Sequence, residues 1–314
     1  MTAYIDLNIF DRLEKIDKLS ESEKTNYQIL LSLLTEKKLL TVYSNAHLND
    51  LFRGYQKNPD FTEGHLKNIQ SLTNNLCICQ YWGEKTVRLH HRDIFEFFQE
   101  KSDELIIDPN TYEDLLSDQP LLQIIAQMYK SQTLPDNFKD GYKEPFFRIM
   151  FPLSKIHNTF YALHSDIYNF QSRLKSDYSL YKTFKTYLLT SLHKIQNKNE
   201  LIKSVNSNFK DLPKHLELTD IFDAYTPDNK TNDNALYSKI IDTFFKYDLA
   251  GYKTDGHFNN MFDDSLHTFY GGHFDFFITN DDRCHYKATK TYDKLNIKTK
   301  VIKIEEIDKI QNCL

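Results

Sequence analysis

Glycine and proline are scarce in this sequence of 314 residues, and the sequence has no net positive charge. The chain has 8 Gly and 8 Pro, which is few for a turn-rich all-β fold and favours long helices. The formal net charge of −5 at pH 7 excludes the overall basic surface that many nucleic-acid-binding proteins carry, but it leaves room for a local basic patch.

Cysteines and long apolar runs are scarce too. The four cysteines are Cys77, Cys79, Cys284 and Cys313. A single residue separates Cys77 from Cys79, which is too tight for the usual structural zinc knuckle, where at least two residues intervene. No apolar run reaches the length of a membrane span, and the N-terminus lacks the apolar core of a signal peptide. We therefore expect a reduced, cytoplasmic, soluble protein with no membrane association.

Hydrophobic and aromatic residues are abundant enough to form a large core. Hydrophobic residues make up 40% of the sequence and charged residues 26%, and 20 Tyr and 23 Phe supply an aromatic interior. The length suits two domains, or one large domain that carries an insertion.

The two ends of the chain alternate strands with helices. Residues 1–55 read as strand, helix, strand, helix, and Ser44 is expected to cap the second of these helices. The C-terminal third reads as two helices, a strand over residues 274–278, a helix over residues 282–295 and a strand over residues 299–304. This alternation predicts an α/β fold with a parallel sheet.

The middle of the chain follows a different pattern. Between residues 93 and 222 apolar residues recur at helical spacing, with no strand alternation and no Gly-rich loop. A hairpin is expected before this region, over residues 77–82 and 86–89, and a polar loop follows it at residues 226–234. The predicted α/β domain comprises residues 1–60 and 233–314, and the predicted insertion, which is mostly helical, comprises residues 61–232.

Four acidic residues stand at places that a parallel sheet brings to one edge. Asp6 follows the first strand and Asp281 the late strand, and open α/β sheets bind ligands beyond the carboxyl ends of their strands. Asp50 lies in the helix after the second strand, and Asp264 is expected at the start of a late helix. Carboxylate oxygens suit Mg²⁺ or Mn²⁺, and two such ions can activate water against a phosphodiester. The secondary candidates are Asn8, His47, Asp263, His267, Asn280 and Asp282.

Each acid also has an ordinary structural explanation. Asp6 or Asp281 can serve as a helix N-cap, and Asp50 can be a solvated helix residue. Asp263 or Asp264 can favour the positive end of a helix dipole, and periodicity does not settle which of the two is a ligand. The coincidence of the acids at one sheet edge favours the functional interpretation.

Five segments are similar to the motifs of one family: Tyr-Ile-Asp-Leu-Asn at residues 4–8, Tyr-Ser-Asn-Ala-His-Leu-Asn-Asp-Leu at 43–51, Asp-Ser-Leu-His at 264–267, Phe-Ile-Thr-Asn-Asp at 277–281 and Lys-Val-Ile-Lys-Ile-Glu-Glu at 300–306. These segments resemble the PIN-like nuclease domains, over the first 55 or so residues and about the last 80. The family usually has Glu where this chain has Asp50, so a shorter reach is required there.

The resemblance implies a three-layer Rossmann-like parallel sheet in which Asp6, Asp50, Asp264 and Asp281 are the catalytic, metal-binding acids. It implies an endonuclease that depends on one or two Mg²⁺ or Mn²⁺ ions, leaves 5′-phosphate and 3′-hydroxyl ends, and acts on RNA rather than DNA. A bacterial toxin or defence effector is the expected setting. The helical insertion would be a substrate gate, a surface for a homo-oligomer, or the docking site of a protein that restrains or activates the enzyme.

Histidines and basic residues near the acids have two interpretations each. His47 and His267 each lie three residues from a candidate acid, so they either hold a carboxylate or contact the scissile phosphate, or are buried and hydrogen-bonded for structural reasons. Lys253, Arg283 and Lys287 are close to the acidic motifs in sequence and are expected to touch a nucleic-acid backbone. Four further basic residues could contact phosphate, although isolated basic residues are usually ordinary surface residues: Arg53, His90, His91 and Arg92.

Three other functions compete with the nuclease. A haloacid-dehalogenase-like phosphatase needs Asp-x-Asp after its first strand, but the second position here is Asn8. A nucleotide-binding protein would need a Gly-rich phosphate loop, and neither common form of that loop occurs. The remaining alternative is a non-catalytic PIN-like scaffold that binds a partner through its helical insertion, against which the four intact acids argue.

Overall fold

The computed structural model describes residues 1–59, 62–81, 84–107, 112, 116, 120–197, 217–225 and 236–312. The chain divides into two compact units, of which unit 1 comprises Met1–Leu105, Lys203–Asp255 and Asn260–Leu314, and unit 2 comprises Ile106–Ile202 and Gly256–Asn259. The loop predicted at residues 226–234 lies outside the described residues. None of the described helices is both long and apolar enough to cross a lipid bilayer.

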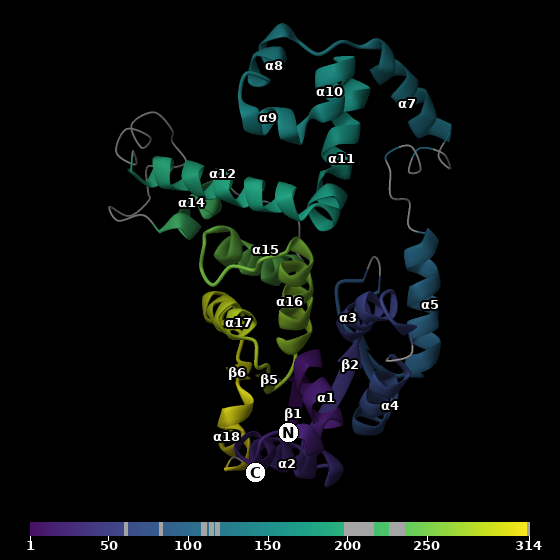
Figure 1. The fold of residues 1–314 in the computed structure, drawn as a ribbon, viewed down its shortest axis with the longest axis vertical. Coiled ribbons are helices and arrows are strands. Elements are labelled where there is room, and N and C mark those ends of the chain that lie inside the picture. The colour runs from purple at the N-terminus through teal and green to yellow at the C-terminus, as the bar shows by residue number, and fades with distance from the viewer. Residues whose placement is uncertain are drawn as a thin grey trace. The chain divides into compact units, whose positions relative to one another are not determined.

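Unit 1 is an α/β structure around a six-stranded sheet (Figure 1). Its strands are β1 (Thr2–Ile5), β2 (Leu40–Ser44), β3 (Leu76–Cys79), β4 (Arg88–His91), β5 (Phe276–Ile278) and β6 (Lys300–Ile302). Its helices are α1 (Leu7–Glu14), η1 (Ile16–Lys18), α2 (Glu21–Thr35), α3 (Asn45–Tyr55), α4 (Thr62–Thr73), α5 (Ile94–Ile107, with its last two residues in unit 2), α14 (Leu218–Tyr225), α15 (Leu236–Leu249), α16 (Phe258–Gly271, with its first two residues in unit 2), α17 (Asp282–Leu295), η4 (Ile304–Glu306) and α18 (Asp308–Gln311).

The strand order is β4-β3-β2-β1-β5-β6, and every pairing is parallel except that of β3 with β4. The first strand therefore lies beside the late strand, as the sequence predicts. The antiparallel pair of β3 and β4 confirms the predicted hairpin, although residues 82 and 83 lie outside the described part of the chain. The α/β class and the mostly parallel sheet are thus correct.

Apolar residues that alternate along the strands give the sheet two cores. Ala3 and Ile5 of β1 pack in one core with α1, α2, α4 and α5. Tyr4, between them, packs in the other core with α15, α16 and α17. Because successive side chains of a strand point to opposite faces, this division covers both faces of the sheet with helices.

Unit 2 is helical in its described residues. Its helices are α7 (Pro120–Ser131), α8 (Asp136–Gly141), α9 (Pro145–Met150), α10 (Pro152–His157), α11 (Phe160–Ser176) and α12 (Tyr178–Asn197) (Figure 1). The predicted insertion, residues 61–232, contains all of unit 2 except residues 256–259, and it also contains α4, β3, β4, α14 and most of α5 from unit 1.

A candidate site at the carboxyl edge of the sheet

A cavity of about 710 Å³ in unit 1 is lined by all four predicted acids, Asp6, Asp50, Asp264 and Asp281. The sheet register explains how the first and last of them meet. Ile5 of β1 pairs with Ile278 of β5, and the Asp6 N–H donates to the Ile278 carbonyl over 3.0 Å. The chain after each strand therefore leaves the sheet at the same edge, as parallel pairing requires.

Asp6 occupies the N-cap position of α1, but its side chain does not cap that helix. Its Oδ2 instead accepts hydrogen bonds from Asn8 Nδ2 over 2.7 Å and from Thr279 Oγ1 over 2.6 Å. Burial raises the pKa of Asp6, and the charges of Asp50 and Asp281 act in the same direction, although His267 and Thr279 oppose them. The capping explanation fails here, because neighbouring side chains hold this carboxylate instead.

The Asp50 carboxylate is held by one side chain of its own helix and by one from α16. His267 Nε2 donates to Asp50 Oδ2 over 2.9 Å, and Arg53 forms an ion pair with the same carboxylate. Burial raises the pKa of Asp50, but the hydrogen bond from His267 and the charges of His267 and Arg53 outweigh it and lower that pKa. With 16% of its side chain exposed, Asp50 is not the solvated helix residue of the ordinary explanation.

His267 lies between two of the acids. Its Nε2 is 3.9 Å from Asp6 Oδ1 as well as 2.9 Å from Asp50 Oδ2, and its Nδ1 is 2.8 Å from Tyr4 Oη. Burial lowers the pKa of His267, but the hydrogen bond to Asp50 and the charges of Asp6 and Asp50 raise it overall. The sequence suggested that His267 would hold a nearby acid, and the acid that it binds is distant in sequence.

Asp263 and Asp264 are adjacent in sequence but have different surroundings. The Asp264 side chain lines the cavity, whereas the Asp263 carboxylate lies 2.8 Å from Arg53 Nη1. The expectation that Asp264 stands at a helix start is wrong, because α16 begins six residues earlier, at Phe258. Burial raises the pKa of Asp264 well above its usual value, with further contributions from Asp255, Asp6 and Asp281.

Asp281 combines a structural role with its place in the cavity. Its Oδ1 accepts from the N–H groups of Arg283 over 2.7 Å and Cys284 over 2.9 Å, which caps α17 as the ordinary explanation proposed. A ligand in the cavity would therefore be met by Oδ2.

His47 serves the fold rather than the cavity. It is fully buried, its Nε2 donates to the Ile5 carbonyl over 2.7 Å, and its Nδ1 accepts from the Ser44 N–H over 3.0 Å. Ser44 also caps α3, as predicted, by accepting from the Ala46 N–H. Burial, helped by the charge of His267, lowers the pKa of His47 to about 3. The ring is therefore neutral and holds α3 against β1.

The other secondary candidates divide into one residue at the cavity and two away from it. Asn8 lines the cavity and holds Asp6. Asn280 instead donates to Tyr27 Oη over 2.8 Å and accepts from the Ile304 N–H over 3.0 Å. Asp282 forms an exposed ion pair with Lys303. Asn280 and Asp282 do not line the cavity.

The prediction that Lys287 touches a nucleic-acid backbone is wrong. Its side chain is fully buried, with Nζ 2.7 Å from Asp248 Oδ2 and in contact with Asp255. Helical spacing on α17 does not reveal this, because both acids come from other segments. Lys253 and Arg283 are exposed, so the prediction made for them stays open.

The structure adds residues that the sequence did not single out. Asp11, Lys15 and His65 also line the cavity. Asp11 could have been found, because it stands three residues after Asn8 on α1 and therefore on the same helix face. His65 Nδ1 lies 2.5 Å from Glu14 Oε2 and 3.9 Å from Asp11 Oδ1, at the side of the cavity formed by α1 and α4.

The donor chemistry of the cavity fits Mg²⁺ or Mn²⁺. Its predicted ligands are carboxylates, the hard oxygen donors that these ions prefer. The raised pKa values of Asp6 and Asp264 come partly from the charges of other acids in the cavity, and a cation would neutralise that excess. Within the described residues, no three of the predicted acids bring their oxygens within 4.8 Å of one another.

Comparison of the chain with family models, with curated proteins and with solved structures found no match.

Proposed function

We propose that the chain is a Mg²⁺- or Mn²⁺-dependent endonuclease of the PIN-like type, with RNA as its preferred substrate. The observation that carries this proposal is the lining of one cavity by Asp6, Asp50, Asp264 and Asp281. They come from four segments spread over most of the chain, at the sheet edge where α/β proteins bind ligands. Chance would rarely collect four carboxylates there, because like charges repel one another.

The charge of the cavity supports a cation-dependent reaction. Five carboxylates line it, those of Asp6, Asp11, Asp50, Asp264 and Asp281. Among the described residues that line the cavity, Lys15 and Arg53 are cationic; Lys15 is paired with Asp11, and Arg53 is paired with Asp50 and Asp263. A phosphodiester is an anion, so this cavity would repel it without added positive charge.

The residues of the chain would hold the site ready for the ions. Bound Mg²⁺ or Mn²⁺ would supply Lewis-acid chemistry, which lowers the pKa of water and stabilises charge on the phosphate. Asn8 and Thr279 fix the Asp6 carboxylate, and His267 fixes that of Asp50. Partners of this kind orient metal ligands and are commonly as important as the ligands themselves.

The biological setting follows only from the resemblance to PIN-like domains. We propose a cytoplasmic bacterial toxin or defence effector, in which helical unit 2 gates the substrate, mediates self-association or binds a regulating protein.

The test is Mn²⁺-dependent cleavage of labelled single-stranded RNA and single-stranded DNA. Wild type is expected to cleave and EDTA to stop it, and Asp6→Asn and Asp281→Asn are expected to abolish cleavage. Asp17→Asn is the matched control, because its side chain is 94% exposed and lies outside the cavity. Activity in Asp6→Asn equal to that of wild type would overturn the proposal.

A calorimetric Mn²⁺ titration separates the remaining outcomes. Binding without cleavage would point to a missing activator or another nucleic acid. Neither binding nor cleavage would favour the non-catalytic scaffold that binds a partner.

A further inference from the structure

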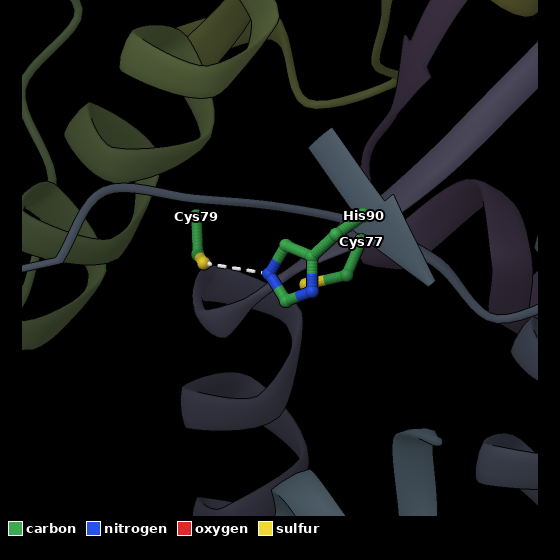
Figure 2. Close-up of side chains that lie close together, drawn as sticks. All are labelled: Cys77, Cys79 and His90. Atoms are coloured by element: carbon green, nitrogen blue, oxygen red, sulfur yellow. Dashed lines mark hydrogen bonds between the residues drawn. The ribbon is translucent and has the colours of Figure 1, made fainter. Parts of the chain in front are cut away.

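Two thiols and an imidazole converge on one face of the β3–β4 hairpin, outside the carboxylate cavity (Figure 2). Cys77, Cys79 and His90 each offer one ligand atom, and these three atoms lie within 4.8 Å of one another. His90 Nε2 is 3.3 Å from Cys79 Sγ and 3.1 Å from Tyr81 Oη.

The strand geometry explains why the three side chains meet. Cys77 and Cys79 are two residues apart on β3, so both leave the same face of the sheet. The antiparallel register places His90 of β4 directly opposite Cys77. Cys77 and Cys79 are too close in sequence to form a zinc knuckle. The neighbouring strand nevertheless supplies a third donor beside them, His90.

The orientation of β4 is unusual for a strand that only packs. Its Leu89 is 57% exposed, while the next residue, His90, is half-buried and turns towards the two buried thiols. Packing alone would favour the opposite register, because leucine is buried far more often than histidine. The inward histidine therefore points to a role in the chemistry of this group.

The donor set selects a class of metal ion. Thiolate sulfur and imidazole nitrogen suit Zn²⁺ and Cu⁺, whereas Mg²⁺ and Mn²⁺ prefer oxygen. In a tetrahedral zinc site with Zn–S of about 2.3 Å and Zn–N of about 2.0 Å, sulfur and nitrogen ligands stand about 3.5 Å apart. The 3.3 Å between Cys79 Sγ and His90 Nε2 is already close to that separation.

Metal ions bind the thiolate form of cysteine, so an ion bound here would displace the thiol protons of Cys77 and Cys79.

We propose that Cys77, Cys79 and His90 bind one thiophilic metal ion, Zn²⁺ or Cu⁺, which clamps the edge strand β4 to β3. Three protein ligands leave the fourth position of Zn²⁺ to water. Because β4 is an edge strand and pairs with β3 alone in the sheet, the ion would add a second link between the two strands. This site is independent of the proposed nuclease chemistry, since none of its ligands lines the carboxylate cavity.

The test uses the full-length chain, reduced and stripped of metal, in anaerobic titrations. Zn²⁺ is added in competition with a chromophoric chelator, and Cu⁺ is titrated separately against a Cu⁺ chelator. We expect one equivalent to bind, and we expect Cys79→Ala and His90→Gln to lower the affinity by more than the roughly 10–100-fold that loss of an outer partner costs. Asp6→Asn should leave this binding unchanged, which keeps the test separate from the carboxylate cavity.

Two matched variants control for general damage. Cys284→Ala removes a buried thiol elsewhere in unit 1, and His91→Gln changes the next residue of β4, whose Nδ1 is 3.1 Å from the Asn74 carbonyl. Both should bind like wild type, and the melting temperature in chelator shows that every variant is folded. Zn²⁺ should raise the melting temperature of wild type by more than that of His90→Gln, because stabilisation by a ligand of the folded state grows with the affinity of that state.

The arms of the titration decide between the ions. Binding of Zn²⁺ or of Cu⁺ that depends on Cys79 and His90 supports the site and identifies its metal. Failure of wild type to bind either ion would overturn the proposal. It would also be overturned if Cys79→Ala and His90→Gln both bound the ion with the affinity of wild type.

Discussion

His267 Nε2 donates to Asp50 Oδ2 over 2.9 Å, although 217 residues separate the two in the sequence. The bond joins α16 to α3 across the end of β1. Tyr4 Oη, 2.8 Å from His267 Nδ1, fixes the other side of the ring. Because His267 is only 1% exposed, the Asp50 carboxylate is oriented from within the protein rather than from solvent.

Replacement of this histidine should weaken metal binding. In His267→Phe, the Asp50 carboxylate loses the hydrogen bond that orients it. We expect the Mn²⁺ affinity to fall by about 10–100-fold, the usual cost of losing a partner that orients a metal ligand. Calorimetric titration measures it, with His273→Phe, an exposed histidine after α16, as the control. Equal affinity in the two variants would show that His267 does not position the site.

Two substitutions at Asp281 separate its cap from its charge. Asp281→Ser keeps a side-chain oxygen for the N–H groups at the start of α17, so the free energy of unfolding should change little. Asp281→Ala removes the cap and should cost about 1 kcal/mol. Both should lose Mn²⁺-dependent cleavage, because both lack the carboxylate. Urea unfolding in EDTA and the cleavage assay measure the two effects, and an active Asp281→Ser would assign this residue to the cap alone.

The strands and the edge at which they end were predictable, because both depend on local pattern. Apolar runs that stop before Asp6 and before Thr279 mark the ends of β1 and β5, and parallel pairing then brings these ends together. The helix of Asp50 was predictable from the cap at Ser44. In these cases a few neighbouring residues carry the information.

The contacts between distant segments were not predictable in the same way. Helical periodicity gives Lys287 a place on α17, but nothing near it in sequence shows that Asp248 and Asp255 enclose it. The same holds for His90, which reads as a surface residue until the strand register places it against Cys77. Each position depends on how separate elements pack, which a single sequence does not specify locally.

The buried cluster of Lys287 with Asp248 and Asp255 should give a measurable pH dependence. Lys287 and the partly exposed Arg283 face Asp255, as does Asp248. Burial, opposed by Lys287 and assisted by Asp248, raises the pKa of Asp255 to about 6. A raised folded-state pKa means that the folded state holds the proton more tightly, so this contribution to stability is complete below the unfolded pKa and is lost as pH rises through about 6.

Asp255→Asn should remove that contribution. The difference in melting temperature between wild type and Asp255→Asn should favour wild type most at about pH 4 and shrink or reverse by about pH 7. Thermal unfolding in EDTA across this range measures it, with Asp17→Asn as the control. A difference that does not vary with pH would show that Asp255 titrates at the same pH in both states.

Loss of the lysine should be far more damaging than loss of either acid. Lys287 is fully buried, so Lys287→Met leaves two buried carboxylates without their counter-charge. Breaking a buried pair in this way costs about 3–5 kcal/mol, because the unpaired charge stays in a poor solvent. Lys290→Met, at an exposed position of the same helix, should change stability by less than about 0.5 kcal/mol. Urea unfolding at neutral pH compares the two, and similar losses would mean that water reaches the cluster and replaces the lysine.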